Sequence, residues 1–109
     1  MAQSITIDGQ SYELRYDFGA AEQFERETHK EYFNALVNPG AKTIKVLLML
    51  GVKHAKPKIT EDEAASMIQR FLNAGNNLGR LWKPIFEALK EAGLTAPEES
   101  TNPIDSAGS

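Results

Sequence analysis

The chain has 109 residues, 41% of them hydrophobic and 25% charged, which fits a single domain large enough to bury its own core. No apolar run approaches the roughly 20 residues that a membrane helix needs, so a membrane-spanning protein is not expected. The formal net charge of −3 gives no overall attraction to nucleic-acid phosphates, so nucleic acid is not an expected partner. Residues 1–4 lack the pattern of a signal peptide and the chain has no cysteine, and we therefore expect a cytoplasmic location.

The N-terminal residues predict a β-hairpin. Polar and apolar residues alternate over 4–7 and 11–16, and Asp8 and Gly9 between them are typical of a two-residue turn. Pairing Ile7 with Gln10 gathers four apolar side chains on one face: Ile5, Ile7, Tyr12 and Leu14. Because an isolated hairpin is marginal in water, this face must pack against helices of its own domain or against another copy.

The first helix is predicted to begin after Asp17, which can act as its N-cap. We interpret Phe18 as a core anchor and Tyr16 as the strand end, with Glu22 and Arg26 forming an exposed pair four residues apart. The buried side of this helix is expected to contain Ala20, Ala21, Phe24 and Thr28. Residues 31–37 either continue the helix or form a short second one before the break at 38–40.

Residues 43–53 predict a central, deeply buried helix, because their apolar side chains surround nearly the whole circumference. A strand is the alternative, since Ile44, Val46, Leu48 and Leu50 alternate. Thr60 and Glu63 then form a capping box, which predicts a helix that ends near Gly75.

The last helix is expected to run from about Asn77 to Gly93. Pro84 lies inside its pattern and should kink this helix or mark its true start. The fold class is therefore α+β and mostly α, with an N-terminal hairpin and four or five packed helices. Residues 1–94 form the single domain, and residues 95–109 form a disordered C-terminal tail rich in Pro, Glu, Ser, Asn and Gly.

The residue pattern does not indicate catalysis, a metal or a cofactor. His29 and His54 are the two imidazoles, without a cysteine or a paired-histidine spacing beside them, and Gly75 and Gly79 lack the lysine of a phosphate-binding loop. The acidic residues 61–63 are best interpreted as a solvated first turn of a helix. The basic residues between 42 and 58 are best interpreted as a solvated rim around the central helix.

Several segments together resemble the small tail assembly chaperones of long-tailed bacteriophages, in the branch shared with gene transfer agents. These segments are the hairpin, Arg15–Ala20, Leu48–His54 and Ile59–Glu63, and the similarity spans about residues 5–93. The resemblance implies a non-enzymatic protein of the host-cell cytoplasm, not expected in the mature virion. It would bind the tape measure protein, keep it soluble and assist assembly of the tail tube, whose subunit is a second candidate partner. The resemblance also implies that a longer, frameshifted product can exist.

The last two predicted helices carry an apolar stripe, and a stripe with this spacing is usually buried in the protein core. If part of it stays exposed, four residues are the candidate partner-binding surface: Phe71, Leu78, Trp82 and Phe86. The chain could also bind further copies of itself and form a homo-oligomer. Two other functions remain alternatives, namely a virion structural component, such as a head-tail connector or tube-associated subunit, and a small helical DNA-binding regulator.

Overall fold

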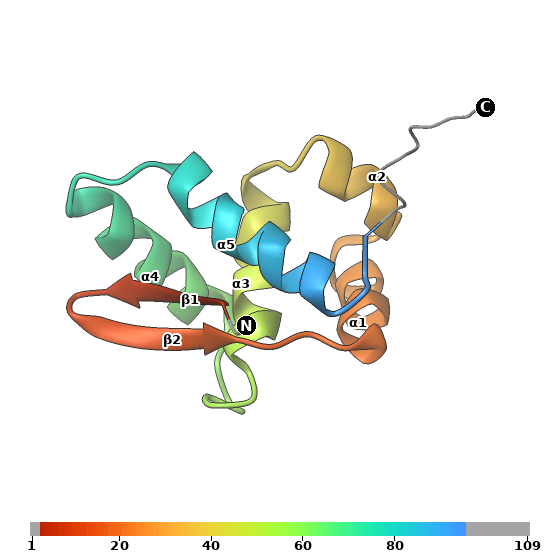
Figure 1. The fold of residues 1–109 in the computed structure, drawn as a ribbon, viewed down its shortest axis with the longest axis horizontal. Coiled ribbons are helices and arrows are strands. Elements are labelled where there is room, and N and C mark those ends of the chain that lie inside the picture. The colour runs from red at the N-terminus through yellow and green to blue at the C-terminus, as the bar shows by residue number, and fades with distance from the viewer. Residues whose placement is uncertain (1–2, 96–109) are drawn as a thin grey trace.

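The computed structural model describes residues 3–95 and confirms a mostly helical α+β fold that begins with an antiparallel hairpin (Figure 1). The elements in chain order are β1 (Gln3–Ile7), β2 (Gln10–Leu14), α1 (Phe18–Thr28), α2 (Tyr32–Val37), α3 (Ala41–Val52), α4 (Glu61–Asn73) and α5 (Leu78–Glu91). Apart from Thr95, the predicted disordered tail lies outside the described residues. Within the described range, no helix combines the length and the apolar character needed to cross a membrane.

The hairpin has the predicted register. Ile7 pairs with Gln10 and Ile5 with Tyr12, so the apolar face forms as expected, with Ile5, Ile7 and Leu14 buried and Tyr12 half-buried. Asp8 and Gly9 both adopt positive φ angles, of 54° and 77°, as a tight hairpin turn requires. This face packs against the helices of its own domain, because α5 contacts both strands, α4 contacts β1, and α3 contacts β2.

The central helix is α3, and the strand alternative for this segment is wrong. Val46, Leu47 and Leu48 are fully buried, and the helix contacts α1, α4, α5 and β2. Apolar side chains around the whole helix are buried because other elements pack against it on several sides, as the sequence predicts. Figure 1 shows α1 and α2 at one end of the molecule and α4 at the other, with α3 between them.

The helix ends follow the local signals. Thr60 and Glu63 form the predicted capping box at the start of α4, and the Asn77 side chain caps the start of α5. Pro84 lies within α5 without marking its start, because the first turn at Asn77 is already capped. Gly75 and Gly93 follow α4 and α5 with φ angles of 98° and 78°, which a residue with a side chain seldom adopts.

The chain from the end of β2 through α1 differs from the prediction in three places. Strand β2 ends at Leu14, so Tyr16 lies beyond the strand and does not end it. Phe18 is not a core anchor but is 70% exposed at the first position of α1, outside the hydrophobic core. The anchor at this junction is the half-buried Tyr16, whose hydroxyl donates a hydrogen bond of 2.6 Å to the Leu47 carbonyl. The expected pair of Glu22 and Arg26 does not form, since Arg26 donates to the Gln23 amide oxygen instead.

The chain between 29 and 31 separates α1 from α2, which settles the open choice in favour of a short second helix. His29 ends α1 in the left-handed conformation, with φ of 56°. The backbone amide of Tyr32 then donates to the Glu25 carboxylate at 2.9 Å, so a side chain of α1 holds the first turn of α2. The two helices therefore diverge at a fixed corner and leave a groove between them.

Candidate functional site

The predicted partner-binding residues separate into a buried and an exposed set. Phe71 is only 9% exposed and belongs to the core, so it offers a partner little surface. Leu78 is 36% exposed at the start of α5. Trp82 and Phe86 are half-buried one turn apart, with ring centroids 6.0 Å from each other. The structure thus brings Trp82 and Phe86 together on the outer side of α5, which we call the α5 face.

A second apolar surface was not predicted from the sequence. It is a groove of about 600 Å³ between α1, α2 and the end of α5, which we call the α1–α2 groove. Its lining residues are Phe18, Ala21, Glu22, Glu25, Glu31, Tyr32, Phe33, Asn34, Gly93 and Leu94. Phe18 and Phe33 are 70% and 54% exposed, so large aromatic rings stand open to water beside the groove.

One sequence signal for this groove exists in α2. The six residues of this helix include five apolar ones, Tyr32, Phe33, Ala35, Leu36 and Val37. A helix packed on one side cannot bury side chains around its whole circumference. Tyr32, Ala35 and Leu36 are buried, which leaves Phe33 and Val37 outside. The excess of apolar residues in a short surface helix was therefore the available signal.

Three carboxylates stand around the apolar part of the groove. Glu22 and Glu25 come from α1, and Glu31 precedes α2. Glu25 is held by the Tyr32 amide, and Glu31 accepts a hydrogen bond of 2.8 Å from the Asn34 side chain. Among residues 3–95, the lining of this groove includes no Lys or Arg. Its electrostatic character is therefore anionic.

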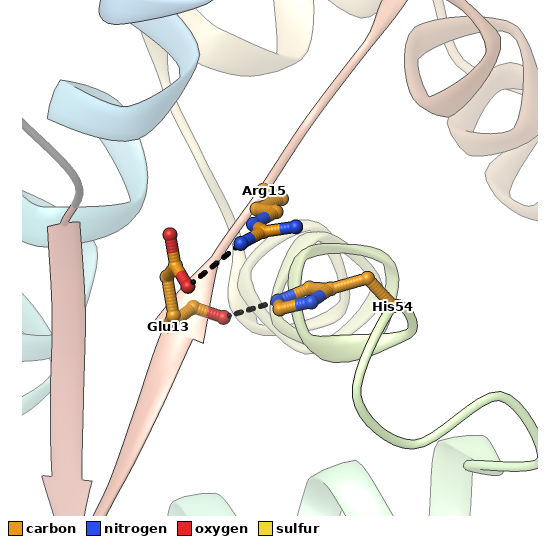
Figure 2. A network of polar contacts seen from close by, with 3 residues as sticks. All are labelled: Glu13, Arg15 and His54. Atoms are coloured by element: carbon orange, nitrogen blue, oxygen red, sulfur yellow. Dashed lines mark hydrogen bonds and ion pairs between the residues drawn. The ribbon is translucent and has the colours of Figure 1, made fainter.

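A second hollow, of about 570 Å³, lies where β2 meets the end of α3, with Arg15, Lys53 and His54 among its lining residues. Figure 2 shows the polar contacts there. His54 Nε2 lies 2.8 Å from the Glu13 carbonyl oxygen, and this contact requires Nε2 to carry the proton because a carbonyl only accepts. Arg15 forms an ion pair of 3.2 Å with the Glu13 carboxylate.

These contacts give His54 and Arg15 a structural explanation. His54 binds the Glu13 carbonyl and so holds the end of β2 against the end of α3, whereas the Arg15 side chain pairs with Glu13 two residues earlier in the same segment. A cation such as Lys53 near the carbonyl end of a helix is also favourable. The polar groups at this hollow thus fasten two elements together.

Tyr16 and Tyr32 are the groups with shifted acidity. Burial raises the pKa of the Tyr16 hydroxyl well above its ordinary value, and the nearby Tyr32 raises it further. Burial likewise raises the pKa of the Tyr32 hydroxyl, which has no hydrogen-bond partner among residues 3–95. Both phenols therefore stay protonated at neutral pH, and their rings act in packing.

The His, Asp and Glu side chains of the described residues do not gather into one site. Within residues 3–95, no group of three or more His, Asp or Glu side chains gathers in an arrangement that could hold a metal ion. His29 is the C-cap residue of α1, and His54 binds the Glu13 carbonyl. The features that stand out are therefore the two apolar surfaces.

Comparisons of the chain with protein-family models, with curated proteins and with solved structures gave no match. Evidence for a function therefore comes from the surfaces of this molecule and from the resemblance of its segments to the tail assembly chaperones.

Proposed function

We propose that this protein is a non-enzymatic tail assembly chaperone of a long-tailed bacteriophage. It binds the tape measure protein, keeps it soluble and assists assembly of the tail tube around it. The proposal places the protein in the host-cell cytoplasm during assembly and outside the mature virion. Its support is the segment resemblance together with the apolar surfaces of the domain.

The observation that carries the proposal is the exposure of large apolar side chains on a domain with a well-filled core. Phe24, Leu47, Leu81 and Ile85 are completely buried. Within the described range 3–95, four other large apolar residues nevertheless remain exposed, namely Phe18, Phe33, Val37 and Leu78. Exposed aromatic rings are efficient anchors for another protein, since each buries a large area with little loss of side-chain entropy.

A chaperone for a long, partly apolar client needs surfaces of this kind. Covering the client's apolar segments removes them from water and from one another, which suppresses aggregation. The α5 face and the α1–α2 groove offer such contacts from separate parts of the helical layer. The domain itself needs no reactive side chain for this activity.

Co-expression tests the proposal directly. The tape measure protein of the same phage is produced with and without this chain, and its soluble fraction is measured after centrifugation. We expect the soluble fraction to rise when the chain is present. An unchanged soluble fraction would contradict the proposed activity.

The composition of purified phage particles provides a second test. Quantitative mass spectrometry should find this chain absent or far below the stoichiometry of the tail tube subunit. A stoichiometric amount would instead identify a virion structural component. Retention on a DNA column at moderate salt would favour the regulator alternative, which the net charge of −3 argues against.

A further inference from the structure

We propose that the α1–α2 groove binds a cationic amphipathic segment, in which apolar side chains are flanked by Lys or Arg. The inference rests on the proposed function for the identity of the client, in which such a segment would lie. The aromatic and acidic side chains of the groove determine which kind of segment can bind there.

The apolar part of the groove is a continuous aromatic surface. Buried Phe24 packs edge-on against Tyr32, with ring centroids 5.9 Å apart. Tyr32 in turn lies 5.5 Å from Phe33, which is open to solvent. The groove therefore has a floor anchored in the core and an exposed aromatic wall. A volume of about 600 Å³ accommodates a few side chains of a bound segment.

The charged side chains that line this groove are all acidic. Glu22, Glu25 and Glu31 line the groove, and Gly93 and Leu94 bring the carbonyl end of α5 to it. Lys or Arg beside the apolar anchors of a ligand would meet complementary charge here.

The same charges argue against the two other occupants that the chain itself could supply. Residues 96–109 follow directly after the groove, but they include Glu98, Glu99 and Asp105 and no Lys or Arg. A second copy docked groove to groove would bring two sets of carboxylates together, because a twofold interface places the same patch on both sides. Both arrangements oppose like charges, whereas a basic segment pairs opposite ones.

A pair of synthetic peptides tests this selection on the full-length chain. One is a labelled helix-forming peptide with Leu and Phe on one side and Lys on the other, and its partner has Glu in place of Lys. Binding is measured by fluorescence anisotropy at low and high salt. We expect the Lys peptide to bind, with an affinity that falls as salt rises, and the Glu peptide to bind at least about tenfold more weakly.

Two sets of variants locate the binding. Glu22→Gln with Glu31→Gln removes two groove carboxylates and keeps the side-chain oxygen that accepts from Asn34. Its control is Asp62→Asn with Glu87→Gln, which removes the same charge from α4 and α5. Phe33→Ala removes the exposed aromatic wall, and Val37→Ala is its control, since Val37 is an exposed residue of α2 outside the groove lining.

The Lys peptide should bind about tenfold more weakly to each groove variant than to its control, with the helical circular dichroism unchanged in all four. Equal affinity for the two peptides, or equal affinity of groove and control variants, would overturn the proposal.

Parallel co-expression with the tape measure protein separates this proposal from the proposed function. A soluble tape measure protein together with no groove selectivity would refute the groove and leave the chaperone role standing. Selective peptide binding together with an insoluble tape measure protein would refute the chaperone role and support the groove chemistry.

Discussion

The phenol of Tyr16 lies directly over the backbone of Gly51. A Cβ atom at position 51 would be 2.6 Å from Tyr16 Cζ and closer still to the hydroxyl oxygen. The Tyr16 hydroxyl donates to the Leu47 carbonyl one turn earlier in α3, and the Arg15 amide donates to the Gly51 carbonyl at 2.9 Å. The segment that follows β2 is therefore held against α3 beside residue 51, where only glycine leaves enough space for the Tyr16 ring.

Gly51→Ala should lower the free energy of unfolding by about 1 to 3 kcal/mol, because the added methyl group displaces the Tyr16 ring from a packed site. Urea denaturation followed by circular dichroism measures the change. Gly40→Ser is the control, since a Cβ at position 40 meets nothing within 4 Å and serine is a good N-cap residue for α3. An equal loss in both variants would show that the Tyr16 contact is not the cause.

Tyr16 and Tyr32 predict a loss of stability at high pH. An unfolded tyrosine ionises near pH 10, whereas the pKa values of Tyr16 and Tyr32 are raised in the folded protein. Above about pH 10 the folded state thus binds more protons than the unfolded state. Their contribution is present in full below that pH, and stability falls above it by about 1.4 kcal/mol per pH unit for each such tyrosine.

Tyr16→Phe should therefore make this alkaline fall less steep, although it lowers stability at neutral pH by removing the bond to Leu47. Urea denaturation between pH 8 and about 12 gives the slope for each protein. Tyr16→Phe combined with Tyr32→Phe should flatten the slope further. A slope that is the same in wild type and both variants would mean that these phenols ionise as freely in the folded protein as in the unfolded one.

The capping box of α4 predicts how much stability is lost when the Thr60 hydroxyl is removed. The Thr60 hydroxyl accepts from the Glu63 amide at 3.1 Å, and the Glu63 carboxylate accepts from the Thr60 amide at 3.2 Å. Thr60→Ala should lower the free energy of unfolding by about 1 kcal/mol, because the Glu63 amide loses its partner. Ser66→Ala, at an exposed interior position of α4, should leave stability unchanged or slightly higher. A Thr60→Ala protein as stable as wild type would contradict this assignment.

The capping box, the hairpin register and the buried central helix were predictable because each depends on neighbouring residues or on a local period. The role of Phe18 was not, because its exposure depends on how α1 lies against α3, which no local pattern specifies. The same holds for Tyr16, which acts through Leu47 and Gly51 more than thirty residues away. The α1–α2 groove was not predictable either, because it is formed by α2 and the end of α5, which come together only in the folded chain.

Trp82 is the single tryptophan of the chain and reports on the α5 face. If the tape measure protein binds this face, a tryptophan-free segment of it should shift the Trp82 emission to shorter wavelength and protect it from acrylamide quenching, because water is excluded from the indole. The Lys peptide proposed for the α1–α2 groove should leave both signals unchanged, since Trp82 does not line that groove. A client segment that binds by anisotropy without altering either signal would show that the α5 face is not its binding site. Client contact would then have to be sought at the groove, where Phe18 and Phe33 are the exposed anchors.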